Sequence, residues 1–91
     1  MTRDEIVNYI AESFEDHLDD ILLADGLEEA FVGVVQACNG TPKACYDYQK
    51  CIEIFAKDMT RDEAVEHMEF NVVGAYVGNF TPTFLYRPTT L

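Results

Sequence analysis

The sequence predicts an α+β fold, in which helices cover one face of a small antiparallel or mixed three-stranded sheet. Two identical capping boxes, TRDE at residues 2–5 and again at 60–63, each begin an amphipathic stretch, as helix starts do. Between them, AFVGVVQA at residues 30–37 is a short run rich in β-branched residues, which is typical of a strand. After Gly78, Pro82 leads a further short apolar run. These observations predict the order α-β-β-α-α-β in a single domain over residues 1–91.

The composition is that of a globular domain, because 48% of the 91 residues are hydrophobic and only three are proline. No apolar run approaches the roughly 18 residues that a membrane span needs, and no apolar leader precedes the first charged residues. The three cysteines, an odd number, fit a reducing compartment in which thiols stay free. We therefore expect a cytoplasmic protein without membrane contact.

The first helix is expected over residues 3–18, with Thr2 as its cap. Side chains at helical spacing then form one apolar stripe, namely Ile6, Val7, Ile10, Phe14 and Leu18 (or His17). An alternative extends this helix through residues 21–23 to a stop near Asp25-Gly26.

The strand at residues 30–37 is apolar without alternation, so we expect it to be central in the sheet and buried on both faces. Gly33 in its middle indicates either a close neighbour or a bulge. Residues 39–42 supply turn chemistry, and residues 43–46 return as the second strand of a hairpin.

Two more helices and a last strand complete the expected fold. Asp47 caps a helix over residues 48–57. The next helix covers residues 61–77 and buries Met68, Val72 and Tyr76, with Gly78 ending it in the left-handed conformation. The last strand is expected over residues 83–86.

The net charge of −11 is concentrated near the N-terminus, since residues 1–29 hold ten acidic residues and a single base. This balance argues against direct nucleic-acid binding, because phosphate contacts need a basic surface. On the expected first helix, one face carries the acidic side chains Glu12, Glu15, Asp16 and Asp19. Such a face either keeps the protein dispersed or docks a basic partner.

Polar residues on the third helix indicate a second kind of site. Glu63, His67 and Asn71 follow one another at four-residue intervals, so they line one helix face, where they would hold a ligand or a metal, or act as a general base with its carboxylate. A second candidate site, for a divalent cation, consists of Asp16, His17 and Asp20. Both sets are incomplete as metal sites, so no metal or cofactor is expected.

The cysteines and aromatics have simpler interpretations. No C-x2-C pair exists for zinc, and Cys51 in a helix interior is typical of a small buried hydrophobe. No Ser/His/Asp, Cys/His or glycine-rich phosphate pattern indicates an enzyme. The aromatic residues Tyr46, Tyr48, Tyr76, Phe80 and Tyr86 either fill the core or form a homodimer contact or partner patch.

Two segments carry a resemblance to a known family. YDYQKCIEIF at residues 46–55 and DEAVEHMEFNVVGAYVGNFTPTFL at 62–85 resemble short, acidic, functionally uncharacterised proteins of bacteriophages and prophages. The similar region spans about residues 29–85 and leaves the acidic first helix outside. The resemblance implies a viral or mobile-element origin and a role in modulating host machinery, but no site residues.

The leading hypothesis from the sequence is thus a non-enzymatic interaction protein that binds a basic host protein through its acidic N-terminal helix. The alternative is a small ligand- or metal-binding domain that uses the polar groups around His67.

Overall fold

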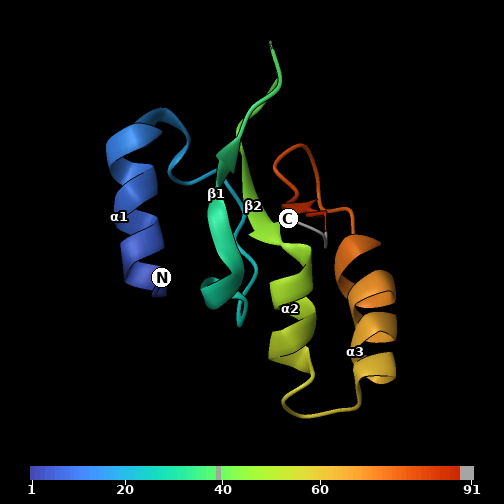
Figure 1. Ribbon diagram of the computed structural model, residues 1–91. Helices are drawn as coiled ribbons and strands as arrows, with labels where there is room; N and C mark the ends of the chain where they lie inside the picture. Colours follow the sequence, from blue (N-terminus) through green and yellow to red (C-terminus); the bar gives the residue numbers. More distant parts are fainter. Residues whose placement is uncertain (39, 89–91) are drawn as a thin grey trace.

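The computed structural model describes residues 1–38 and 40–88, and these form an α+β fold in the expected order (Figure 1). Asn39, part of the expected turn at residues 39–42, lies outside the described residues. In chain order, the helices and strands are α1 (Arg3–Ser13), β1 (Phe31–Val35), β2 (Lys43–Asp47), α2 (Tyr48–Phe55), α3 (Arg61–His67) and β3 (Thr83–Leu85). Short 3-10 helices occupy Glu15–His17 and Glu28–Ala30, and a π-helix, Met68–Val73, continues α3. In Figure 1, α1 lies on one side of the sheet strands and the α2–α3 pair on the other.

The sheet is mixed, with the strand order β1-β2-β3. β2 pairs antiparallel with β1 and parallel with β3, so β2 is the central strand. The prediction that the first strand is central and buried on both faces is therefore wrong. β1 is an edge strand, and Val32 and Val35 are 45% and 43% exposed. Its apolar run resembles a buried strand because an edge strand at this position still packs Phe31 and Val34 against the core.

The irregularity predicted at Gly33 is a bulge. The pairing register shifts between Phe31 and Gly33, which leaves Val32 without a partner on β2. No atom lies within 4 Å of a Cβ placed on Gly33, so a close neighbour is not the reason for the glycine. A bulge also twists an exposed edge away from pairing with other chains.

The core is arranged around Tyr46 on the central strand, which is fully buried. Its ring contacts Phe31 and Phe84 from the two edge strands, with centroid distances of 5.7 and 6.2 Å. The Tyr46 hydroxyl accepts a hydrogen bond of 2.8 Å from the backbone N–H of Ala24. Other side chains buried in the core come from the helices and from the segment before β1. They are Ile6 and Ile10 from α1, Leu27 from that segment, Cys51 and Ile52 from α2, Ala64 from α3 and Met68 from the π-helix.

Both capping boxes form as predicted. The Thr2 hydroxyl accepts from the Glu5 N–H at 3.2 Å, and the Glu5 carboxylate accepts from the Thr2 N–H at 2.8 Å. Thr60 and Glu63 repeat this exchange at 3.2 and 3.0 Å. These bonds lower the pKa of both glutamates, since they favour the charged carboxylate.

The first helix ends earlier than predicted. Phe14 leaves the helical region with φ −140° and ψ 47°, and its ring packs edge-on against Tyr9 at 6.2 Å. Residues 15–17 then form a 3-10 turn, Leu18 is exposed, and the alternative extension through residues 21–23 does not form. The expected apolar stripe therefore holds only over α1 itself.

The third helix also changes before its expected end at residue 77. After His67 it widens into the π-helix, where the Gly74 N–H donates to the Glu69 carbonyl at 3.1 Å, five residues earlier. Tyr76 therefore lies beyond the helix and is 75% exposed, which corrects its predicted burial. Gly78 does adopt a positive φ of 110°, but in the loop that follows rather than at the helix end.

The other predicted bounds coincide with the observed ones or differ by one or two residues, as helix and strand ends commonly do. Over the residues that the structure describes, no helix has the length and apolar character that a membrane crossing requires.

Candidate functional site

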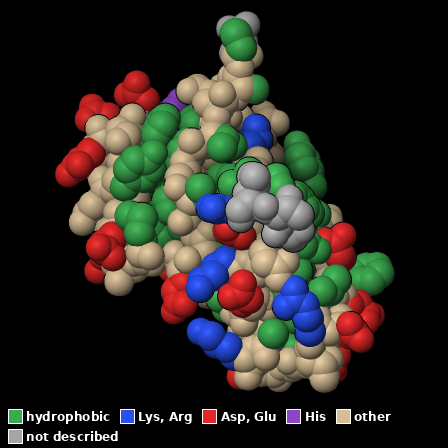
Figure 2. All heavy atoms as spheres, viewed as in Figure 1, with side chains coloured by type: hydrophobic (Ala, Val, Ile, Leu, Met, Phe, Trp, Pro, Cys, Tyr) green, Lys and Arg blue, Asp and Glu red, His purple; other side chains and the backbone are tan. Residues whose placement is uncertain are grey.

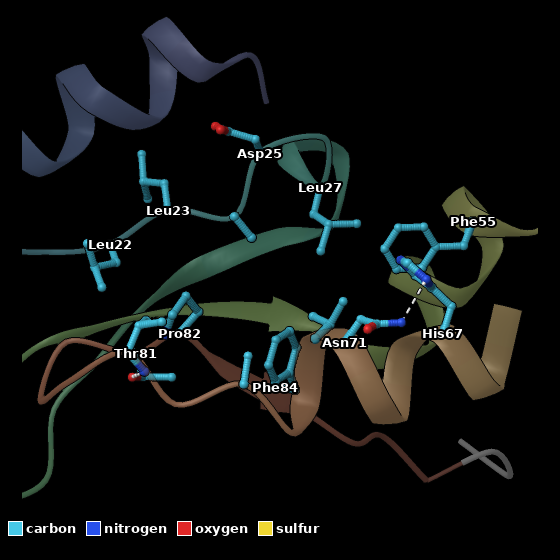
Figure 3. A pocket seen from close by; sticks show the side chains of 14 residues that line it. Leu22, Leu23, Asp25, Leu27, Phe55, His67, Asn71, Thr81, Pro82 and Phe84 are labelled. Atoms are coloured by element: carbon cyan, nitrogen blue, oxygen red, sulfur yellow. Dashed lines mark hydrogen bonds between the residues drawn. The ribbon is translucent and has the colours of Figure 1, made fainter.

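A pocket of about 510 Å³ lies between the segment 22–27 and the wall formed by α3, the π-helix and the start of β3 (Figure 3). This volume falls within the range of about 300–1,000 Å³ that is usual for small-molecule sites. Figure 3 shows Leu22, Leu23 and Pro82 at one end and Phe55 and His67 at the other. Most lining side chains are apolar, namely Leu22, Leu23, Ala24, Leu27, Phe55, Val72, Ala75, Val77, Pro82 and Phe84.

One wall of the pocket is the segment 22–27, which belongs to no helix or strand. A hydrogen bond connects this segment to the sheet, because the Tyr46 hydroxyl oxygen on β2 accepts from the Ala24 N–H. The segment is also connected to α1, since the Arg3 guanidinium pairs with the Asp25 carboxylate at 2.5 Å. Gly26 turns the chain with a φ of 89°, and Leu27 then enters the core.

The opposite wall includes the loop before β3. The side chain of Thr81 makes hydrogen bonds within this loop. The Thr81 hydroxyl donates to the Gly78 carbonyl at 2.6 Å and accepts from the Val77 N–H at 2.9 Å. The Thr41 hydroxyl donates to the Asn79 carbonyl at 3.0 Å and so ties the loop to the β1–β2 hairpin. Thr81, although it lines the pocket, therefore already uses its hydrogen-bonding groups within the protein.

His67 and Asn71 form the polar end of the pocket. They lie four residues apart, and the Asn71 Nδ2 and His67 Nδ1 atoms are 3.2 Å apart. With the Asn71 amide donating, Nδ1 accepts and the neutral ring carries its hydrogen on Nε2. The imidazole is held edge-on against Phe55, with ring centroids 4.6 Å apart. No other described residue bonds Nε2 or the Asn71 carbonyl oxygen, so this end offers one donor and one acceptor.

Glu63 was predicted to share one helix face with His67 and Asn71, but its carboxylate has a different role. Its carboxylate accepts from the Thr60 N–H in the capping box and makes no hydrogen bond to His67. Glu63 lines a second pocket, of about 470 Å³, together with Met59, Glu66, Phe70 and the shared residues His67 and Asn71. The structure thus joins His67 and Asn71 at one site and places Glu63 beside it.

The four acidic residues of the predicted docking face do not share one helix face. Glu12 lies in the last turn of α1, Glu15 and Asp16 lie in the 3-10 turn, and Asp19 follows it. The reason is the early end of α1, since the spacing argument needs a continuous helix. All four are exposed, and none pairs with a basic side chain among the described residues. Figure 2 shows acidic side chains spread over the part of the surface where α1 lies.

The possible cation site at Asp16, His17 and Asp20 does not form. His17 Nδ1 lies 3.5 Å from the Asp20 carboxylate, and the His17 ring packs against Phe80. Residues 1–38 and 40–88 contain no group of three or more His, Cys, Asp or Glu side chains close enough to hold a metal ion. The metal-binding part of the sequence-based alternative therefore has no cluster to support it there.

All three cysteines are free thiols, and only Cys38 is exposed. Burial raises the pKa of the Cys51 thiol to about 12, with a smaller contribution from the Asp47 carboxylate. A thiol that stays protonated at neutral pH is a poor nucleophile, so Cys51 acts as a packed apolar group.

The aromatic residues divide between the core and the surface. Tyr46 fills the core, whereas Tyr76 and Tyr86 are exposed. Tyr48 stacks on Tyr86 at 4.3 Å and donates to the Glu69 carboxylate at 2.7 Å. Burial and this hydrogen bond raise the pKa of Tyr48 to about 12. A homodimer contact through the exposed aromatics stays a prediction.

The sequence indicated His67 and Asn71, but it did not indicate the apolar residues opposite them. Leu22-Leu23 beside the Asp25-Gly26 turn was the available signal for a packed segment outside the helices. Pro82 and Phe84 were recognised only as parts of a strand. No local motif connects these segments, because the pocket arises from tertiary packing.

Comparison of the chain with protein-family models, curated proteins and solved structures gives no match. The resemblance to phage and prophage proteins therefore stays a prediction.

Proposed function

We propose that the protein is a non-enzymatic binding domain whose pocket takes a small organic molecule with an apolar body and one hydrogen-bonding end. The observation that carries this proposal is the apolar pocket of about 510 Å³ with His67 and Asn71 as its polar end. A mostly apolar cavity with few convergent polar groups is the usual form of a ligand site.

The arrangement supports binding rather than catalysis. His67 is hydrogen-bonded by the Asn71 amide and packs against the Phe55 ring. Among the described residues, no carboxylate bonds the imidazole to orient it as a general base. The hydroxyl of Thr81 is bonded within its own loop and is a poor candidate for a nucleophile. Among the described residues, those that line the pocket include no cysteine or serine.

The expected affinity is modest. Burial of about 200 Å² of apolar ligand surface contributes about 5 kcal/mol at about 25 cal/mol per Å². This corresponds to a Kd on the order of 0.1–1 mM before the cost of ordering the ligand is counted. Detection therefore needs a method that works at millimolar ligand.

The test is an NMR titration of the ¹⁵N-labelled protein with tryptophol, a neutral probe with an indole body and one hydroxyl. We expect chemical-shift changes at the backbone amides of the segment 22–27 and of the π-helix. Ala75→Phe, which places a large ring at a residue that lines the pocket, should weaken binding at least tenfold. His67→Ala or Asn71→Ala should weaken it about two- to tenfold, since each removes one hydrogen bond.

The matched control is Ala37→Phe, the same substitution at an exposed position outside the pocket. It should leave tryptophol binding unchanged. Absence of shifts at millimolar tryptophol, or equal binding by the Ala75→Phe and Ala37→Phe variants, would contradict the proposal.

A second candidate function is docking of a basic partner protein, which in the phage interpretation is a host protein in the cytoplasm. The observation that favours it is the group of exposed carboxylates of Glu12, Glu15, Asp16 and Asp19, which have no basic partner within the described chain. Unpaired surface charge of one sign steers oppositely charged partners. Neutralising these four residues tests this candidate.

A further inference from the structure

The proposed ligand pocket shares a wall with a second pocket of different chemistry. His67 and Asn71 line both, so a molecule held beside them in the first pocket has one end at the second.

The second pocket carries negative charge and an open aromatic ring. Glu63, Glu66 and Phe70 line it, and Phe70 has 76% of its surface exposed. One Glu63 oxygen accepts from the Thr60 N–H, and Glu66 has no hydrogen-bond or ion-pair partner among the described residues. Carboxylates and the face of an aromatic ring are the groups that bind organic cations.

No lysine or arginine lines either pocket within the described chain. Arg3 is paired with Asp25, which lines the first pocket. The whole chain has a net charge of −11. An anionic ligand would therefore meet Glu63, Glu66 and a negative protein, whereas a cation would be attracted by all three.

We infer that the ligand is a small organic amine, with its apolar body between Leu27 and Phe84 and its ammonium group beyond His67, facing Glu66 and Phe70. This inference rests on the proposed function, because it needs the first pocket to hold the apolar body. It adds the charge of the ligand and the residues that select it.

The test compares three probes with the same indole body: tryptamine, a cation; tryptophol, which is neutral; and indole-3-propionate, an anion. The chain contains no tryptophan, so indole fluorescence excited beyond the tyrosine band reports the ligand alone. We expect tryptamine to bind about three- to tenfold more tightly than tryptophol, from a partly exposed ion pair and a cation–π contact. Indole-3-propionate should bind most weakly.

Two further measurements place the ammonium group. The tryptamine-to-tryptophol affinity ratio should fall towards one in Glu66→Gln and in Phe70→Leu, and it should fall as salt is raised. Glu53→Gln is the matched control, because Glu53 is an exposed acid on α2 that lines neither pocket. This control should keep the wild-type ratio.

The outcomes separate the two proposals. If tryptophol binds but tryptamine binds no better, the inference of a cationic ligand is overturned and the binding function stands. If the tryptamine advantage survives in Glu66→Gln, the assignment of the ammonium group to the second pocket is wrong. If none of the three probes binds, the proposed function fails together with the inference.

Discussion

Glu63 and His67 show how two roles compete for one side chain. Their spacing of four residues predicts a carboxylate beside an imidazole, yet the TRDE capping box at 60–63 predicts that the same carboxylate turns back to Thr60. The capping role prevails, with Glu63 accepting the Thr60 N–H at 3.0 Å. The backbone N–H at a helix start needs a partner, whereas His67 finds one in Asn71. A capping-box glutamate therefore has one carboxylate oxygen committed to the helix start, and here it does not orient the imidazole four residues later.

Met68 and Phe70 lie two residues apart in the π-helix and provide a matched pair for a stability test. Met68 is fully buried, whereas Phe70 is 76% exposed. We expect Met68→Ala to lower the free energy of unfolding by about 2–4 kcal/mol, because it leaves a cavity in the core. Phe70→Ala should change it by less than about 0.5 kcal/mol. Chemical denaturation measures both, and a Met68→Ala variant as stable as Phe70→Ala would show that the helix is packed differently.

At the scale of whole elements, helix starts were predictable and helix ends were not. Thr2, Asp47 and Thr60 each cap the helix expected from the sequence, since a cap is a local signal. The apolar spacing from Ile6 continues past Ser13 to Leu18, so periodicity alone extends the helix too far. At the actual end, Phe14 leaves the helical region and packs edge-on against Tyr9, and the apolar spacing carries no signal for this change.

The position of β1 in the sheet shows the same limit. A short apolar run predicts a strand but does not say whether it is central, since that depends on where β3 pairs. β3 is three residues long and pairs with β2 from a distance of nearly forty residues along the chain, as between Thr83 and Cys45. Only this pairing makes β2 central and β1 an edge.

The hydroxyl of Tyr46 connects the segment 22–27 to the sheet, and removal of this hydroxyl tests the link between the sheet and the pocket. Tyr46→Phe leaves the Ala24 N–H without its partner, at an expected cost of about 1–3 kcal/mol in unfolding free energy. Because Ala24 and its neighbours form one wall of the pocket, tryptophol binding should weaken as well. Denaturation and the NMR titration measure the two effects.

The control for this variant is Tyr9→Phe. Tyr9 packs against Phe14 and Phe31, but its hydroxyl bonds no other described residue. We expect near-neutral stability and unchanged tryptophol binding. Equal effects of Tyr46→Phe and Tyr9→Phe would show that the Ala24 bond does not position the segment.

For the molecule as a whole, the fold class was predictable and the pocket was not. The α+β class follows from local signals, which occur in the right order along the chain. The pocket needs residues 22–27, 67–75 and 81–84 to meet, and only the core around Tyr46 brings them together. Polar residues at helical spacing, such as His67 and Asn71, were identifiable because both lie on one element. The apolar residues opposite them carry no signature beyond hydrophobicity.

The uneven charge is the other property of the whole molecule, and it separates the two candidate functions. We consider a variant with four neutral substitutions, Glu12→Gln, Glu15→Gln, Asp16→Asn and Asp19→Asn. All four positions are exposed and lie outside the core that holds Ile6 and Ile10, so the fold should survive. Glu12 also lies in the last turn of α1, where a negative charge opposes the helix dipole. The melting temperature should therefore stay constant or rise.

If these carboxylates dock a basic partner, the variant should lose basic proteins that the wild type retains from a bacterial lysate at about 50 mM salt. The loss should come mainly through slower association, and wild-type retention should fall steeply at higher salt, where the Debye length drops below about 10 Å. A control variant removes the same charge elsewhere, through neutral substitutions at the exposed acids Glu29, Glu53, Asp58 and Asp62. Equal retention by the two variants would mean that the acidic residues near α1 supply only net charge. Tryptophol binding should be the same in both variants, because none of the eight residues lines its pocket.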